Sequence, residues 1–296
     1  MSRPHIWMLH GPTASGKTAL AIALANKLQA NVLNCDARQV YQELNIGVAR
    51  PSDEELAAAH HLGIASHSIH SPLTAMSFAQ WARPIVQEEL SRHGHLVIVG
   101  GSGLYAKALL YETDALPAAD PTVRTDLEAR WNTDREALVQ ELVRRDPAYA
   151  AHADLSNSRR VIRALEVITL SGQPYSAQRT MGREAKAHFD ADLREIALWP
   201  PMEALTQRIQ QRSGQMLAKG LRQEAENLAA YKSLTAMQTV GYREFYAHPD
   251  ADDASIASLI ATHTRQYAKR QLTWLKKQTG VRPVELGTTA EKLLRA

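Results

Sequence analysis

One octapeptide near the N-terminus constrains this 296-residue chain more than any other segment. It consists of Gly11, Pro12, Thr13, Ala14, Ser15, Gly16, Lys17 and Thr18, and it matches the pattern G-x-x-x-x-G-K-[ST]. A short apolar run precedes it and an amphipathic stretch follows, so the match lies between a predicted strand and a predicted helix. Backbone N–H groups, the helix dipole and the Lys17 ammonium could hold phosphate oxygens there, and the Thr18 hydroxyl could ligate Mg²⁺. The alternative is a glycine-rich turn that binds nothing.

The first 110 residues alternate apolar runs with amphipathic stretches, a pattern typical of βαβ units around a parallel sheet. Strands are predicted at Ile6–Leu9, Val32–Cys35 and Leu96–Val99, and helices at Lys17–Leu28 and Ser77–His93. The run from Gly100 to Gly103 leads into a further apolar helical stretch through Leu110. We therefore expect an α/β fold, a P-loop-containing core whose parallel sheet is flanked by helices. Such sheets bind ligands at the carboxyl ends of their strands, where loops begin at Gly11, Asp36 and Gly100.

The pattern changes between residues 116 and 184, where prolines separate helical stretches rich in Arg, Glu and Ala without any strand signal. We expect an inserted all-helical domain at 116–184, between a first part of the core at 1–115 and a second part at 185–296. The second part should contain a strand at Leu193–Leu198, one long helix from about Glu203 to Tyr231, and a last helix at Ser255–Gln278.

Composition narrows the class of protein but names no partner. There is no apolar run of 18 residues and no signal-peptide pattern, which favours a cytoplasmic protein without a membrane span. A single cysteine, Cys35, excludes a disulfide framework. The net charge is only +3, but residues 254–284 contain no Asp or Glu and form a basic stripe with six cations: Arg265, Lys269, Arg270, Lys276, Lys277 and Arg282. Interleaved aromatic residues make this stripe suitable for nucleic acid, although a solvated helix face would have the same composition.

Asp36 is the clearest acidic residue at the end of a predicted strand, whereas the run Leu96–Val99 ends in glycine and serine. Nucleotide hydrolases usually carry a carboxylate at such a second strand end to hold the metal. A lone carboxylate beside a phosphate loop could instead act as general base or as a metal-shell ligand. The alternative is an N-cap or an Asx-turn.

Taken together, these residues resemble the tRNA dimethylallyltransferases, also called tRNA isopentenyltransferases. The resemblance rests on ordered motifs from residue 11 to residue 271: GPTASGKT at 11–18, DARQVY at 36–41, NIG at 45–47, GGSGLY at 100–105, RVIRALEV at 160–167, VGYR at 240–243 and TRQYAKRQ at 264–271. Ala37 stands where the family usually has Ser, and Ser102 stands where it usually has Thr.

The resemblance implies a reaction. The family transfers a dimethylallyl group from dimethylallyl diphosphate to N6 of the adenosine 3′-adjacent to the anticodon, position 37, and releases diphosphate. It implies that Gly11 to Thr18 and Arg208 hold the diphosphate with Mg²⁺ at Thr18, that Asp36 is the general base, and that Lys17, Thr13, Ser102 and Arg208 assist. Arg208 shares a helix face with Arg212, and both could instead pair with Glu203 or Glu224.

The resemblance also implies contacts with the anticodon arm of tRNA, partly on the insertion. The matching residues are Asp36, Ala37, Arg38, Gln39, Ser102, Arg124, Arg159, Arg160, Val161, Ile162, Arg163, Gln238, Thr239, Val240, Gly241, Tyr242, Arg243, Thr264, Arg265, Gln266, Tyr267, Ala268, Lys269, Arg270 and Gln271. We expect a monomer. Two other functions stay open, an ATP-dependent small-molecule kinase and a non-catalytic RNA-binding P-loop protein, and so does a close variant that prenylates free adenine nucleotides.

Overall fold

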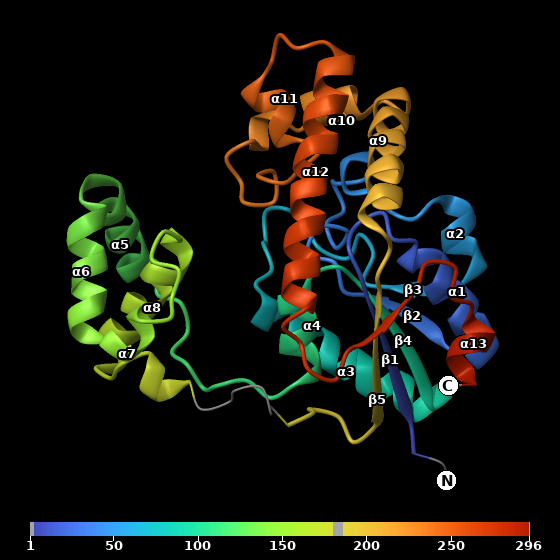
Figure 1. Ribbon diagram of the computed structural model, residues 1–296, viewed down its shortest axis with the longest axis horizontal. Helices are drawn as coiled ribbons and strands as arrows, with labels where there is room; N and C mark the ends of the chain where they lie inside the picture. The colour runs from blue at the N-terminus through green and yellow to red at the C-terminus, as the bar shows by residue number, and fades with distance from the viewer. Residues whose placement is uncertain (1–2, 180–185, 296) are drawn as a thin grey trace. The chain divides into compact units, whose positions relative to one another are not determined.

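A computed structural model describes residues 3–179 and 186–295 of the chain (Figure 1). It divides into two compact units, one made of Met1–Tyr111 with Ala187–Ala296 and the other of Glu112–Lys186. The sequence-based boundary between residues 184 and 185 lies outside the described residues.

The larger unit is built on a six-stranded sheet in which every pair of neighbouring strands is parallel. Its strands are β1 His5–His10, β2 Asn31–Asn34, β3 His61–Leu62, β4 His95–Val99, β5 Asp192–Leu198 and β6 Arg282–Val284, in the order β3-β2-β4-β1-β5-β6. The predicted α/β fold is therefore confirmed. The short strands β3 and β6 were not predicted, because neither is long enough to show an alternating pattern.

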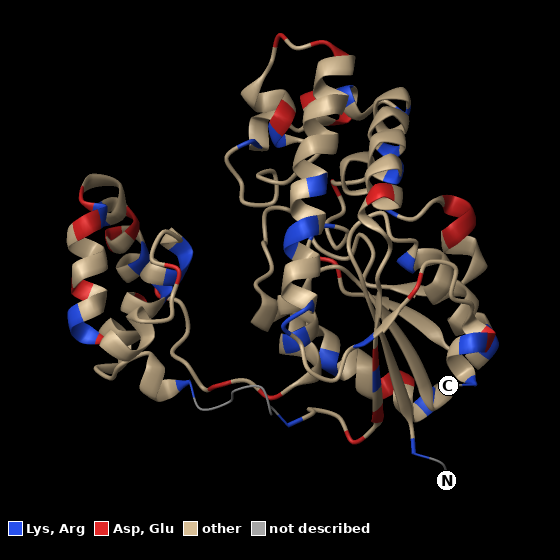
Figure 2. Ribbon diagram, in the orientation of Figure 1, with Lys and Arg blue, Asp and Glu red and all other residues tan. Residues whose placement is uncertain are grey.

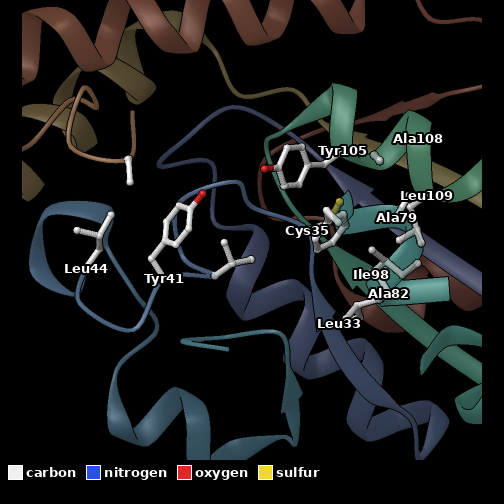
Figure 3. Packing of buried hydrophobic residues seen from close by; sticks show 14 of the residues in the cluster. Leu33, Cys35, Tyr41, Leu44, Ala79, Ala82, Ile98, Tyr105, Ala108 and Leu109 are labelled. Atoms are coloured by element: carbon white, nitrogen blue, oxygen red, sulfur yellow. The ribbon is translucent and has the colours of Figure 1, made fainter. Parts of the chain in front are cut away.

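Successive residues of β1 point to opposite faces of the sheet, as a strand requires. Ile6 and Met8 pack on the face covered by α3 Ala75–His93 and α4 Gly103–Leu110, whereas Trp7 and Leu9 pack on the face covered by α1 Lys17–Leu28 and α13 Ala290–Leu294. The first face continues into the loop after β2, where Tyr41 and Leu44 are buried (Figure 3). The loops after the strands are thus fixed by the same core as the sheet.

The strand register brings three loops to one edge. Leu9 of β1 lies opposite Val99 of β4, and Asn34 of β2 lies opposite the same Val99. Consequently the loops that begin at Gly11, Asp36 and Gly100 leave the sheet side by side. Gly100 packs directly on the Cys35 carbonyl, where a Cβ would not fit.

The segment predicted as one helix from Glu203 to Tyr231 consists of three separate elements: α9 Met202–Ala218, α10 Leu221–Asn227 and the 3₁₀ turn η3 Ala229–Tyr231. The prediction was wrong because Gly220 adopts φ +95°, which ends α9 and redirects the chain. The remaining elements of this unit are η1 Ile46–Val48, α2 Asp53–Ala58, α11 Arg243–Ala247 and α12 Asp253–Leu275. Helix α12 lies along α9, with Ala268 buried against Leu205 and Ile209 (Figure 1).

The smaller unit contains helices joined by loops, and no strand lies within its described residues. It contains α5 Pro121–Thr133, α6 Arg135–Arg145, α7 Pro147–Ala150, α8 Ser158–Ser171 and the 3₁₀ turn η2 Ser176–Gln178. Asp120, Asp134, Asp146 and Asn157 cap the N-termini of its α-helices, each accepting a backbone N–H with its side chain. The core contains Leu127, Leu138, Leu142, Val161 and Leu165.

The chain leaves the larger unit and returns to it through neighbouring residues. Tyr111 and Ala187 form an isolated antiparallel bridge, and the Glu112 N–H donates to the Lys186 carbonyl at 2.9 Å. In the part of the chain that the structure describes, no helix is long and apolar enough to cross a membrane.

Candidate active site

The phosphate loop connects β1 to α1, as the sequence predicts. Gly16 adopts φ +87° at the N-cap of α1, and Ala14 has φ +63°, so the backbone turns sharply between them. The Lys17 Nζ donates to the Pro12 carbonyl at 2.7 Å, which curls the side chain back over the loop. The Ser15 hydroxyl is buried without a hydrogen-bond partner among the described residues.

The charge on Lys17 is sensitive to its surroundings. Burial lowers the pKa of its ammonium from 10.5 to about 8; Asp36 opposes this shift, and Arg212 adds to it. Near neutral pH the group is charged but poorly solvated. An anion that enters the loop would therefore gain from a cation that little water screens.

Helix α9 brings two arginines to the phosphate loop. The Arg212 Nη2 donates to the Thr13 hydroxyl at 2.6 Å, and the Arg208 Nη1 lies 3.6 Å from the place that a Cβ on Gly16 would occupy. The alternative pairing with Glu203 or Glu224 is absent from the salt bridges of the described residues. Burial lowers the pKa of Arg212, and the Asp36 charge partly compensates. These cations add to Lys17 at the same loop.

Asp36 follows β2 and forms the Asx-turn that the sequence left as an alternative. Its Oδ1 accepts the N–H groups of Arg38 at 2.8 Å and Gln39 at 3.4 Å. The hydrogen bonds of this carboxylate within the described residues all fall on Oδ1. The turn therefore fixes the side chain and leaves Oδ2 for another partner.

Ser102 and Tyr267 join Asp36 from two other elements. The Ser102 hydroxyl accepts the Ala37 N–H at 2.9 Å, which holds the loop after β4 to the loop after β2. Tyr267 of α12 is partly exposed, and its partial burial, followed by the Asp36 charge, raises the pKa of its phenol to about 12. Both side chains are thus neutral donors and acceptors at neutral pH.

Gln271 of α12 makes a connection that sequence reasoning missed. Its Oε1 accepts the Thr13 N–H at 2.9 Å, and its Nε2 donates to the Gly101 carbonyl at 2.9 Å, in a side chain that is only 7% exposed. The sequence predicts a tRNA contact at this position. The side chain bridges the phosphate loop and the loop after β4, a role that no local sequence signal indicates, and the tRNA contact stays a prediction.

The residues predicted to contact tRNA on α12 divide by face. Thr264, Ala268 and Gln271 are buried, whereas Gln266, Tyr267, Lys269 and Arg270 are exposed and Arg265 is half-buried. Cations follow one another along the exposed side of the helix (Figure 2). A helix with one face in the core and a cationic face outward suits attraction to a phosphate backbone.

The predicted contacts on the helical unit divide in the same way. Arg124 and Arg163 each donate at 2.6 Å to the Oε2 of Glu166, whose side chain is fully buried. Val161 and Ile162 belong to the core of this unit, while Arg159 and Arg160 are exposed. Two of the four arginines thus hold a buried carboxylate, and the other two are open to solvent.

The predicted contacts between residues 238 and 243 lie at the loop after β2. Tyr242 is buried and Gly241 packs on the Gly47 carbonyl, whereas Gln238 is exposed and donates to the Lys232 carbonyl at 2.7 Å. Thr239 and Val240 are half-buried, and Arg243 pairs with the buried Glu244 at 3.1 Å.

The residues at the phosphate loop suit Mg²⁺ in one respect. Among the described residues no three His, Cys, Asp or Glu side chains gather as a metal cage. Mg²⁺ commonly keeps several waters and binds through substrate phosphates with few protein ligands. The half-buried Thr18 hydroxyl, next to Lys17, fits the part of a single protein oxygen.

Comparisons of this sequence with a family model and with curated proteins match the same family. The family model described as IPP transferase matches residues 39–278. A tRNA dimethylallyltransferase of Chlorobium chlorochromatii is 40% identical, over 96% of this chain and 94% of that protein. A similar relative from Cytophaga hutchinsonii is 37% identical over 97% of this chain and 94% of its own length.

Solved structures agree with the sequence matches. The full-length tRNA isopentenylpyrophosphate transferase of Bacillus halodurans has a TM-score of 0.69 and 30% identity, covering 99% of this chain and 94% of that one. A eukaryotic dimethylallyltransferase, described as acting on tRNA, has a TM-score of 0.81 and 25% identity, covering 96% and 74%. With a model match over most of its length and relatives at up to 40% identity, this chain belongs to the IPP transferase family.

Proposed function

We propose that this protein transfers a dimethylallyl group from dimethylallyl diphosphate to N6 of the adenosine 3′-adjacent to the anticodon, position 37, in tRNA. The observation that carries the proposal is a phosphate loop with three cations, Lys17, Arg208 and Arg212, beside a single carboxylate, Asp36. A diphosphate leaving group needs the cations to stabilise its negative charge, and an amine nucleophile needs the carboxylate to accept its proton. Membership of the IPP transferase family supports the same pairing.

Departure of diphosphate is the step that the phosphate loop serves. As the bond between the allylic carbon and the diphosphate oxygen breaks, negative charge grows on that oxygen. Lys17 and the two arginines of α9 face this charge at fixed positions, and each well-aimed donor contributes about 3 kcal/mol to such a transition state. Mg²⁺, bound through Thr18, would neutralise further phosphate charge.

Asp36 serves the other half of the reaction. A new bond forms between the allylic carbon and N6 of adenine, and the amine must lose a proton in the process. The Asx-turn orients the carboxylate through Oδ1, so Oδ2 can accept this proton. A base in a tRNA stack must first be extruded, at a cost of a few kcal/mol, and Ser102 and Tyr267 stand next to Asp36 as partners for it.

The phosphate backbone of the tRNA provides the binding energy that offsets base extrusion. The exposed cations of α12 and the exposed arginines Arg159 and Arg160 are suited to it. We propose a monomer, because one chain carries all the named groups. We also propose a cytoplasmic location, because tRNA is the proposed substrate.

Incubation of the purified protein with dimethylallyl diphosphate, Mg²⁺ and unmodified tRNA tests the proposal, with mass spectrometry of the digested nucleosides as readout. The expected product is N6-isopentenyladenosine at the position next to the anticodon. A phosphorylated small molecule formed from ATP would favour the kinase. Product on free adenine nucleotide alone, or tRNA binding without any covalent product, would reject tRNA prenyl transfer.

A further inference from the structure

The carboxylate of Glu224 on α10 holds the loop that carries Asp36. It accepts three successive backbone N–H groups, from Asn45 at 3.3 Å, Ile46 at 2.9 Å and Gly47 at 3.1 Å. Converging N–H groups of this kind form an anion-binding nest, which here receives a side chain of the protein itself. Ion-assisted hydrogen bonds are about twice as strong as neutral ones.

Tyr242 completes the arrangement from a third segment. Its hydroxyl donates to Glu224 Oε1 at 2.5 Å, and its ring is fully buried. Burial, followed by the Glu224 charge, raises the pKa of this phenol far above its ordinary value, so it stays a donor at every physiological pH. Glu224 therefore joins the turn at 45–47 to the segment before α11.

The packing around this carboxylate leaves no room for a side chain at two glycine positions. A Cβ on Gly47 would lie 2.8 Å from the Tyr242 hydroxyl oxygen and closer still to its ring, and a Cβ on Gly241 would lie 2.5 Å from the Gly47 carbonyl oxygen. Gly47 thus lies against the Tyr242 ring, and the backbone of Gly241 lies against Gly47, so the turn packs closely on the segment before α11.

A short series of hydrogen bonds leads from this turn to Asp36. The Gln39 Nε2 donates to the carbonyls of Val48 at 3.3 Å and Ala49 at 2.9 Å, directly after the nest. The Gln39 N–H in turn donates to Asp36 Oδ1. The position of the catalytic carboxylate thus depends on the place where Glu224 fixes residues 45–49.

The phosphate loop is held by other groups. Gln271 of α12 and Arg212 of α9 bind Thr13, and the hydrogen bonds of the described residues join neither side chain to the turn at 45–47. Loss of the Glu224 contacts should therefore disturb the side of the site that receives the amine and spare the side that receives the diphosphate.

We propose that Glu224 is a positioning residue for the transfer step, acting through residues 45–49 and Gln39 to align Asp36 with the acceptor adenine. This inference rests on the proposed tRNA prenyl transfer. In this proposal the hydrogen bond from the Tyr242 hydroxyl keeps the Glu224 carboxylate in the nest.

The test compares Glu224→Ala, Glu224→Gln and the control Glu226→Ala, an exposed carboxylate on the same helix. We expect Glu224→Ala to lower kcat at saturating tRNA about 10- to 100-fold, because ion-assisted hydrogen bonds that orient the loop are lost. The Kd for inorganic diphosphate should stay within about twofold, since the phosphate loop keeps its own hydrogen bonds. Glu224→Gln keeps one acceptor oxygen and should restore part of the rate, and Glu226→Ala should match the unmodified protein.

Hydrogen exchange of the peptide 36–50 gives a readout that needs no catalysis. Exchange should accelerate in Glu224→Ala and stay unchanged in Glu226→Ala. If Glu224→Ala does not fold, Glu224→Gln and Tyr242→Phe are measured in the same way, each with a smaller expected effect.

Two outcomes for Glu224→Ala overturn the inference. The first is a kcat within about twofold of the unmodified protein together with unchanged hydrogen exchange, since the loss of one hydrogen bond already changes a rate by more. The second is an equal loss of diphosphate affinity and of kcat. Absence of prenylated tRNA with the unmodified protein would instead reject the proposed function, and the exchange experiment would still report on Glu224.

Discussion

The two oxygens of the Asp36 carboxylate have different surroundings. Oδ1 accepts the N–H groups of an Asx-turn, whereas the hydrogen bonds within the described residues leave Oδ2 open. Oδ1 therefore has a structural role in the turn, and the proposed role of general base falls to Oδ2. Substitutions that separate the two roles can be chosen from this geometry.

Asp36→Asn should keep the Asx-turn, because the amide oxygen can replace Oδ1, but it removes the base. We expect kcat to fall about 10²- to 10⁴-fold with tRNA affinity nearly unchanged. Asp36→Ala should abolish turnover as well and also loosen the turn. Single-turnover rates and tRNA binding of both variants check this; a preserved rate in Asp36→Asn would contradict the role of base.

Lys17 should make diphosphate binding depend on pH. Its pKa in the folded chain is lowered to about 8, so the free protein loses this positive charge as the pH rises through about 8. Affinity for inorganic diphosphate should therefore decrease above that pH. In the unfolded chain the Lys17 ammonium keeps its ordinary pKa of 10.5. Between about pH 8 and pH 10.5 the unfolded chain therefore binds more protons than the folded chain, and the contribution of Lys17 to the free energy of unfolding becomes less unfavourable as the pH rises.

Titration calorimetry of inorganic diphosphate between pH 6.5 and 9.5 measures the dependence. Lys17→Met should bind weakly with a flat profile over the same range. An equally steep decrease in Lys17→Met would show that another group is responsible.

At the scale of whole elements, α12 has an exposed face that carries Lys269 and Arg270 and a buried face whose Gln271 contacts the phosphate loop. Gln271→Ala removes the hydrogen bonds to Thr13 and Gly101. At about 1 kcal/mol for each bond, the KM for dimethylallyl diphosphate should rise about 5- to 30-fold. Thr273→Ala, an exposed position on the same helix, serves as control. A larger effect on the KM for tRNA than on that for the diphosphate would contradict this assignment.

Glu166 is a fully buried carboxylate in the core of the helical unit. Glu166 accepts Arg124, Arg163 and the Asp120 N–H, so Glu166→Ala leaves two arginines without their partner. We expect the unit to lose about 3 kcal/mol of stability, below the full cost of a buried pair, because both arginines are partly exposed. Hydrogen exchange of α5 and α8 in the full chain measures it, with exposed Glu128→Ala as control. Unchanged protection would show that the ion pairs are dispensable.

Elements with strong local signals could be predicted, and elements that depend on distant contacts could not. Helix α1 begins and ends at the predicted residues because the phosphate loop and a clear apolar pattern define it. The break at Gly220 was missed, since one glycine within an amphipathic stretch is compatible with a continuous helix. The phosphate loop and Asp36 follow from motifs, whereas the roles of Glu224 and Gln271 depend on contacts 177 and 258 residues away in sequence.

For the whole molecule, the exposed cations of α12 predict a strong dependence of tRNA binding on salt. Lys269→Ala combined with Arg270→Ala should reduce the slope of log K against log salt concentration by about 0.7 to 0.9 for each lost phosphate contact. Lys27→Ala, on α1 and paired with Glu291, should leave the slope unchanged. Binding isotherms at several KCl concentrations measure this. An unchanged slope in the double variant would place the tRNA backbone elsewhere.

The bridge between Tyr111 and Ala187 has a consequence for how such a protein can change during evolution. Because the ends of the helical unit meet at adjacent backbone positions, its length can vary, or the unit can be exchanged, without altering the distance that the remaining chain must span. The sheet and its phosphate loop would tolerate such exchange. Selection can thus remodel the helical unit, and with it the proposed contacts of Arg159 and Arg160, while the strand order stays intact.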